Sequence, residues 1–332
     1  MKKLGCMLMA VLMAVTVSGC SDKKEASENK ETEKKVTLIL DYLPNTNHTG
    51  FYVAKEKGFF KEEGLDVDII EPGDDSTSAT LVAANKGEFG VSYQEDVTYA
   101  RTAEEPLPIR AIATIIQHNT SGFVSLKKEN IKSPKDFEGK VYAGWQAPSE
   151  EAVVKAVMTA AKADFSKLTM VGADGSGFAS LGKSVDIQWE FEGWAVTKGR
   201  MEGYDLKYIP LRELDERLDY YTPVIITSEK MIKEDPETVQ KFMNAVKKGY
   251  EYAIENPDAS AEILSKYAPD YDLKFLKESQ KYLSSEYARD ADSWGVMKDS
   301  VWDNYTAFMY ENKLITEKIK ADEQYTNEFV MK

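Results

Sequence analysis

The chain has 332 residues, of which 42% are hydrophobic and 30% are charged, so it can bury a substantial core. Its length suggests two domains. The formal net charge of −14 disfavours contact with nucleic acid or with an anionic lipid surface, and we expect neither as a partner.

Residues 1–19 predict the leader of a bacterial lipoprotein. Two lysines precede a short apolar run at 4–17, and the run ends in Val-Ser-Gly-Cys, which would make Cys20 the acylated first residue. The alternative is an ordinary signal peptide with a chance cysteine. The polar segment 20–35 predicts a flexible tether. We therefore expect an extracytoplasmic protein that the lipid alone holds at the cell membrane.

Cysteine and histidine are scarce. Cys6 lies in the leader, so Cys20 would be the only cysteine left after cleavage, and the domain could form neither a disulfide nor a cysteine-based metal site. The only histidines, His48 and His118, are too few for a multi-histidine metal centre. We expect no metal and no cofactor.

The segment 36–70 predicts a β-α-β unit. An apolar, β-rich run at 36–40 is followed by a loop rich in Pro, Asn and Thr, by a helical pattern that opens near Gly50 and continues through Gly58, and by a second β-rich run at 67–70. Such a unit makes a parallel crossover.

The loop that opens this unit predicts a binding site. In parallel α/β sheets, the loop at the carboxyl end of a strand lines the ligand crevice. Here it offers donors and acceptors at Asp41, Tyr42, Asn45 and His48. The alternative is a loop whose Asn and Thr side chains only satisfy the local backbone.

The remainder of the chain predicts two α/β lobes. Strands at 89–93 and 109–117 with a helix at 76–86 complete the first lobe, Asp96 is the expected cap of the next helix, and Tyr93 and Gln94 lie at a strand end. Four short strand-like runs and a helix predict a smaller second lobe: 141–143, 168–171, 185–188 and 208–210, with the helix at 150–161.

After Pro223 the chain is expected to return to the first lobe. An apolar run at 224–226 precedes an almost wholly helical segment, in which Asp235-Pro236 and Asn256-Pro257 predict helix starts. Two crossings between lobes are the layout of a type II periplasmic binding protein. The predicted boundaries are 36–122 and 225–332 for lobe 1, and 123–224 for lobe 2.

A second candidate site lies in the segment Q188-W-E-F-E-G-W194. The carboxylates of Glu190 and Glu192 could accept from an amino group and ring nitrogens of a heterocycle, with Phe191 between them. They could also act as a general acid and base, or lie on a solvated turn. Tryptophans at strand ends could converge on a cleft or pack the core. For Trp294 and Trp302 we expect the core.

Four motifs of the chain are distinctive: D41-Y-L-P-N-T-N-H-T-G-F-Y-V-A, Y142-A-G-W-Q-A-P-S-E-E-A, Q188-W-E-F-E-G-W and L218-D-Y-Y-T-P-V. They resemble motifs of solute-binding proteins that serve importers of thiamine pyrimidine precursors. The wider group includes sulfonate binders and the pyrimidine synthases of thiamine biosynthesis. Ala143 and Gln146 stand where these binders usually carry glycine, and Tyr42 stands where tryptophan is frequent. These departures place the cleft shape and the ring partner in question.

The resemblance implies a monomeric, lipid-anchored binding protein without a cofactor, which delivers formylaminopyrimidine or hydroxymethylpyrimidine to ABC permease subunits. We predict that Tyr93 and Trp145 contact the ring, and that Glu190 and Glu192 read its polar edge. The full set of ligand-binding residues that we predict is Asp41, Tyr42, Asn45, His48, Tyr93, Gln94, Trp145, Ser149, Glu190, Phe191, Glu192 and Tyr221.

Two alternatives stay open. One is binding of another solute, a flavin, a sulfonate or a nitrate. The other is a pyrimidine-synthase-like enzyme, in which His48 would be the active-site histidine. The related synthases resemble single-turnover catalysts with a cysteine-rich motif, and no cysteine other than Cys20 would remain here for such a motif.

Overall fold

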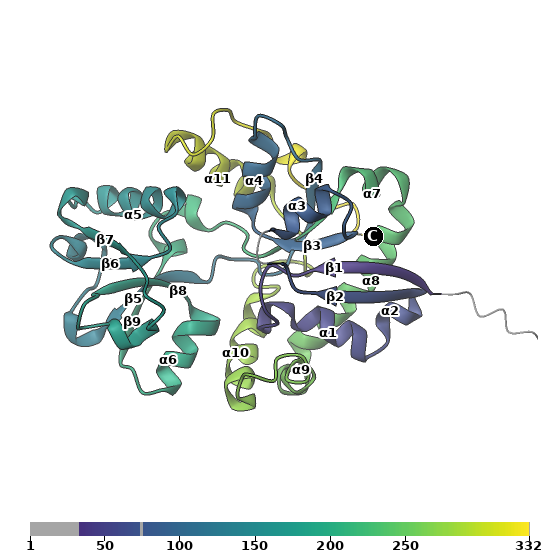
Figure 1. Cartoon of the computed structure of the whole chain (residues 1–332), viewed down its shortest axis with the longest axis horizontal. Coiled ribbons are helices and arrows are strands. Elements are labelled where there is room, and N and C mark those ends of the chain that lie inside the picture. The colour runs from purple at the N-terminus through teal and green to yellow at the C-terminus, as the bar shows by residue number, and fades with distance from the viewer. Residues whose placement is uncertain (1–32, 74–75, 332) are drawn as a thin grey trace, which may run out of the picture. The chain divides into compact units, whose positions relative to one another are not determined.

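The computed structural model describes residues 33–73 and 76–331. The predicted leader and Cys20 lie outside the described residues. Figure 1 shows two separate groups of strands, which form two five-stranded sheets with the orders β2-β1-β3-β10-β4 and β7-β6-β8-β5-β9. The predicted α/β class with two sheets is therefore confirmed.

The first sheet contains β1 (Lys34–Ile39), β2 (Leu65–Ile70), β3 (Phe89–Ser92), β4 (Ile109–Thr114) and β10 (Val224–Ser228). The second contains β5 (Ser121–Leu126), β6 (Val141–Gly144), β7 (Thr169–Gly172), β8 (Ile187–Phe191) and β9 (Leu206–Pro210). The α-helices are α1 (Thr49–Glu56), α2 (Phe59–Glu62), α3 (Ser78–Ala83), α4 (Gln94–Thr102), α5 (Pro148–Ala160), α6 (Thr197–Met201), α7 (Glu229–Glu234), α8 (Pro236–Glu255), α9 (Pro257–Leu264), α10 (Leu273–Glu286) and α11 (Asp299–Glu311).

The predicted β-α-β unit is present, since β1 and β2 pair in parallel. Val36 and Leu38 lie among the buried apolar residues of the core that also contains Phe51 of α1. Gly58 has a φ of +80°, a left-handed conformation that side chains disfavour, so it ends α1 and separates it from α2. The single helix expected through Gly58 is therefore two helices.

The return of the chain to the first sheet is also present. β10 pairs antiparallel with both β3 and β4, so the chain leaves the first sheet after β4 and comes back after β9. The helix α11 then contributes Tyr305, Phe308 and Met309 to the apolar cluster of the second sheet. The division of the chain into lobes stays a prediction, because this C-terminal helix packs against the core of the second sheet.

Some elements differ from the expectations. The strand β5, in which only Phe123, Val124 and Leu126 are large apolar residues, was not predicted, although it lies between β8 and β9. The helix α4 begins at Gln94, so Asp96 lies in its first turn and is not its cap. The predicted cap at Asp235 accepts a hydrogen bond from the Thr238 amide, whereas Asn256 makes no side-chain cap bond.

The two segments that join the sheets are bound to each other. His118 Nδ1 lies 2.6 Å from Asp219 Oδ2, and the Asn119 amide donates to Asp219 Oδ1 over 2.8 Å. Arg212, just beyond β9, donates to the buried carboxylate of Glu286 on α10 over 2.8 Å. These bonds link the two crossing segments to each other and to α10.

The two tryptophans assigned to the core are almost fully buried, Trp294 at 1% and Trp302 at 0% exposure, which confirms that assignment. Within residues 33–73 and 76–331, no helix is both long and apolar enough to cross a membrane. No group of three or more metal-binding side chains was found in the same described residues.

Candidate functional site

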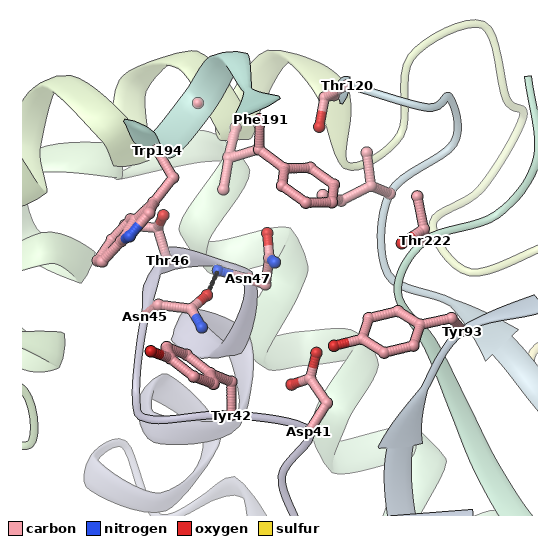
Figure 2. Close-up of a pocket in the computed structure, with 13 residues that line it drawn as sticks. Asp41, Tyr42, Asn45, Thr46, Asn47, Tyr93, Thr120, Phe191, Trp194 and Thr222 are labelled. Carbon is pink, nitrogen blue, oxygen red and sulfur yellow. Dashed lines mark hydrogen bonds between the residues drawn. The ribbon is translucent and has the colours of Figure 1, made fainter. Parts of the chain in front are cut away.

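A cavity of about 240 Å³ lies at the carboxyl end of β1. Figure 2 shows Asp41, Tyr42 and Asn45 on one side of it, Phe191 and Trp194 on the other, and Tyr93 pointing toward Asp41. The lining residues come from β8, from segments next to strands of both sheets and from α10: Asp41, Tyr42, Asn45, Thr46, Asn47, Tyr93, Ile116, Thr120, Phe191, Gly193, Trp194, Thr222 and Leu283.

Asp41 is held as a carboxylate in this wall. Burial opposes its ionisation, but His48, whose Nε2 lies 2.6 Å from Asp41 Oδ1, and a hydrogen bond from Tyr93 hold the pKa of Asp41 below its usual value. His48 is fully buried beneath the loop and is absent from the cavity wall. Its role here is to position Asp41.

The loop 41–50 has a fixed local structure. The Asn45 side chain accepts from the Asn47 amide over 2.9 Å, and the Tyr250 hydroxyl donates to the Asn47 carbonyl over 2.7 Å. A Cβ at Gly50 would meet the Tyr250 ring at 2.3 Å, so only glycine permits this approach of α1 to α8. The Asn45 side chain therefore does satisfy a backbone amide of its own loop, as the alternative interpretation predicted.

A second cavity of about 340 Å³ adjoins the first. Tyr93, Phe191 and Thr222 line both cavities. The remaining residues of the second wall are Glu95, Asp96, Trp145, Ser149, Trp189 and Tyr220. The predicted contacts Tyr93, Trp145, Ser149 and Phe191 are therefore brought together here.

Flat aromatic faces form much of this second wall. The rings of Trp145 and Trp189 lie 5.0 Å apart, and Tyr220 stacks on Tyr305 with 4.0 Å between ring centres. Trp145 is 56% exposed, far more than the other four tryptophans. Its backbone amide donates a hydrogen bond to Glu150 Oε1 over 3.2 Å. An exposed tryptophan held by its backbone offers a face for a planar ligand.

The turn after Trp145 has the backbone conformation that suits the glycine of the family pattern, although this chain carries Gln146 there. Gln146 has a φ of +62°, in the left-handed region that favours glycine. Its amide donates to Glu150 Oε2 over 2.6 Å, which stabilises the turn. At Gly144, just before Trp145, a Cβ would lie 1.6 Å from Glu150 Oε1. A side chain at this position would therefore displace the Glu150 carboxylate.

The charged groups in the two walls are all acidic. Asp41 lines the first cavity, and Glu95 and Asp96 line the second, while no Lys, Arg or His side chain of residues 33–73 and 76–331 lines either one. Burial, and next the nearby Glu95 carboxylate, raise the pKa of Asp96 to about 6. The Tyr305 hydroxyl donates a hydrogen bond to Glu95. A cleft of this charge favours cations and hydrogen-bond donors.

Trp189 adds a polar group without a partner. It is 7% exposed, and its Nε1–H is buried with no hydrogen-bond acceptor in the described part of the chain. An unpaired buried donor costs free energy. The indole lines the second cavity, but its unpaired N–H is buried and is not exposed to that cavity.

Glu190 lies away from both cavities. Successive strand side chains point to opposite faces of a sheet, so Trp189 and Phe191 face the cleft while Glu190 faces the other way. Glu190 lines a third cavity of about 290 Å³, together with the glycine-rich loop at 175–179 and Lys198 of α6. Burial raises the pKa of Glu190 to about 7.

Three further predicted residues have other partners. The Glu192 carboxylate accepts from Arg200 over 3.1 Å and from the Tyr282 hydroxyl over 3.2 Å. Gln94 is fully buried and accepts from the Tyr221 amide over 2.9 Å. Tyr221 is buried, and its hydroxyl accepts from the Lys298 amide over 2.9 Å. These three side chains form hydrogen bonds within the protein, and none of them lines either cavity.

Several wall residues were not predicted as ligand contacts. Tyr220 and Thr222 flank the predicted Tyr221, and Glu95 and Asp96 follow the predicted Gln94. In each case the segment was identified, but the side chain that faces the cavity was not. The helical period of α4 and the strand alternation of β8 show which side chains share a face, but they select the cavity face only once the buried face of each element is known.

Residues 45–260 match the family model described as NMT1/THI5 like. The chain is 25% identical to the formylaminopyrimidine-binding protein of Halalkalibacterium halodurans over 331 residues, with 96% of this chain and 98% of that protein covered. It is 21% identical to the 4-amino-5-hydroxymethyl-2-methylpyrimidine phosphate synthase of Legionella pneumophila, with 90% and 93% covered.

The fold is similar to that of the alkanesulfonate-binding protein SsuA of Xanthomonas axonopodis pv. citri, bound to MOPS. The TM-score is 0.66 at 11% identity, with 88% of this chain and 98% of that chain covered. This likeness confirms the predicted periplasmic binding protein fold.

Proposed function

Because the chain belongs to the NMT1/THI5-like family, we propose that it is the solute-binding component of an ABC importer and that it binds formylaminopyrimidine or hydroxymethylpyrimidine between its two sheets. The similarity to the formylaminopyrimidine-binding protein spans nearly the whole of both chains, which supports a shared ligand class.

The charge and shape of the cavity walls carry this proposal. An aminopyrimidine is planar and presents an exocyclic amino group, so it needs an aromatic face and an acceptor beside it. Trp145 and Tyr93 supply faces, and Asp96 and Glu95 supply acceptors, in one cavity of about 340 Å³. Closure of the two lobes would then exclude water and present a surface to the permease.

Sulfonate or nitrate binding fits the walls less well. Those anions need positively charged or N–H donors, whereas the charged side chains that line the two cavities are Asp41, Glu95 and Asp96. The likeness to a sulfonate binder extends to the fold alone. We therefore assign the site to a donor-bearing heterocycle.

A binding role is also favoured over catalysis. The synthase reading would use His48 as an active-site histidine, but His48 is buried, bonded to Asp41 and absent from both cavity walls. The relative with the highest coverage of both proteins among those described above is a binding protein. We infer that the chain is not an enzyme and acts as a monomer, anchored through Cys20.

Titration calorimetry with a ligand panel tests the proposed function. The domain from residue 33 onward is titrated with hydroxymethylpyrimidine, formylaminopyrimidine, riboflavin, taurine and nitrate. We expect saturable binding of at least one of the two aminopyrimidines and none of taurine or nitrate. Binding of an anion with neither aminopyrimidine bound would refute the assignment.

A further inference from the structure

The second cavity has negative charge that a neutral ligand leaves unbalanced. Glu95 and Asp96 line it, and Asp41, in the adjoining wall, acts electrostatically on Asp96. Among the residues that the structure describes, no basic side chain lines this cavity. A neutral ring that enters would displace water from these carboxylates without supplying opposite charge, and desolvation of an uncompensated carboxylate is unfavourable.

Aminopyrimidines can supply that charge. The exocyclic amino group donates electron density to both ring nitrogens, the one beside the amino-bearing carbon and the one across the ring, and either can bind a proton. When the adjacent nitrogen binds it, the ring N–H and the amino N–H point in the same direction, and the pair matches carboxylate oxygens in the way that a guanidinium does. A flat cation is also attracted to the faces of tryptophan and tyrosine.

We propose that the second cavity takes its aminopyrimidine as the ring-protonated cation, with Asp96 and Glu95 accepting the ring N–H and the amino N–H. This inference rests on the proposed function and specifies the form of the ligand that is bound. The step is a single proton transfer, in which solvent or Asp96 supplies the proton and a ring nitrogen accepts it. The aromatic faces of Trp145 and Trp189 contact the cation from the second sheet.

The surroundings of Asp96 define the pH range. Burial, then Glu95 from the same helix and Asp41 from the loop after β1, oppose the ionisation of Asp96, while the Ser92 hydroxyl, 3.4 Å away, favours it. The phenol of Tyr99 also lies near. The Tyr305 hydroxyl from α11 bonds to Glu95 and leaves Asp96 available. In the empty protein, Asp96 binds its own proton below about pH 6.

Proton uptake on binding should therefore depend on pH. At a pH above the pKa of Asp96 and above that of the free ligand, the empty site and the ligand both lack the proton, so complex formation takes up to one proton from solvent. The dissociation constant then rises by up to about tenfold per pH unit. Below about pH 6, Asp96 already carries the proton, and net uptake falls toward zero.

Calorimetry of hydroxymethylpyrimidine binding at pH 7, 8 and 9, in buffers of different ionisation enthalpy, measures this uptake. We expect uptake approaching one proton per site at pH 8 or 9, and a bound ultraviolet spectrum that matches the ligand in acid. Asp96→Asn should weaken binding at least about tenfold and abolish the uptake. Glu104→Gln removes an exposed acid just after α4 and should behave like the wild type.

Three outcomes would overturn the inference. Binding without proton uptake at any pH would show that the neutral ring is bound, and the proposed function would still stand. Uptake with the ultraviolet spectrum of the neutral ring would place the proton on Asp96 instead of the ligand. Absence of binding of either aminopyrimidine by the wild type would refute the proposed function together with this inference.

Discussion

Single side chains in this site are defined by their partners. Asp41 lies in the cavity wall as a carboxylate because the buried His48 ring and Tyr93 hold it there. Trp189, by contrast, has a buried N–H without an acceptor in the described residues. The first arrangement stabilises the folded protein, and the second costs free energy because a buried donor has no hydrogen bond.

The Asp41 pair predicts a pH-dependent contribution to stability. Because the folded pKa of Asp41 is lowered, its contribution is present above the unfolded value of 3.8 and is lost as the pH falls through the folded value. Asp41→Asn should therefore be less stable than the wild type near pH 7, and the difference should narrow at about pH 3.

Urea unfolding of both proteins at pH 7, 5 and 3 measures this difference. Asp68→Asn, on an exposed position of β2, is the matched control and should show no such pH dependence. An equal gap between wild type and Asp41→Asn at pH 7 and pH 3 would show that Asp41 is not held ionised by its neighbours.

Strand β8 shows how one element divides its residues between two surfaces. Trp189 and Phe191 face the cleft, and Glu190 between them faces the third cavity beside α6. The following π-helical turn at 192–196 brings Trp194 to the first cavity and leaves Glu192 bonded to Arg200. One strand and one turn therefore supply three aromatic side chains to the binding region.

Paired substitutions in β8 test this division. Phe191→Ala should weaken ligand binding about tenfold or more, because Phe191 lines both cavities. Glu190→Gln should leave the affinity unchanged. Calorimetry on the two variants decides between the faces: a loss of affinity in Glu190→Gln would restore the prediction that Glu190 contacts the ligand.

Glu190→Gln should also change stability in a pH-dependent way. The folded pKa of Glu190 is raised from 4.5 to about 7, so the folded wild type loses stability as the pH rises through this range. As the pH rises from 4 to 8, the free energy of unfolding of the variant should increase by on the order of 1–3 kcal/mol relative to that of the wild type. A constant difference across this range, measured by urea unfolding, would contradict the burial of this carboxylate.

The sequence predicted elements better than it predicted which side of an element faces the cleft. The β-α-β unit at 36–70 and the return of the chain at 224 follow from apolar runs and proline-capped helix starts, which are local signals. Two facts depend on which face of each element the rest of the fold covers. Glu190 points away from the cleft, and Tyr220 and Thr222 line the second cavity where Tyr221 was predicted to do so. This face is set by tertiary packing and not by the local sequence. A shift of one residue in strand register would move every side chain of the strand to the opposite face.

At the scale of the whole molecule, the two sheets are joined by two crossing segments and by helix α11. His118 and Asn119 bond to Asp219 across the crossings, and Arg212 bonds to Glu286 of α10. Tyr305 of α11 packs against the second core and bonds to Glu95 of α4. Any closing movement of the sheets would therefore act directly on the second cavity.

The predicted anchor belongs to this scale as well. Cys20→Ser should remove the lipid and release a protein that still binds ligand, because every residue proposed for the site lies at or beyond Asp41. Fractionation of cells that express each form, followed by a high-salt wash, provides the measurement. A Cys20→Ser protein that stays in the membrane fraction would contradict the lipid anchor.

A crystal structure of the complex with hydroxymethylpyrimidine tests the central claim most directly. We predict that the ring lies in the second cavity against Trp145 or Tyr93, with its amino edge about 3 Å from the carboxylate oxygens of Asp96 or Glu95. A ring bound outside the walls of both cavities, or one whose amino edge contacts neither carboxylate, would contradict the proposed site.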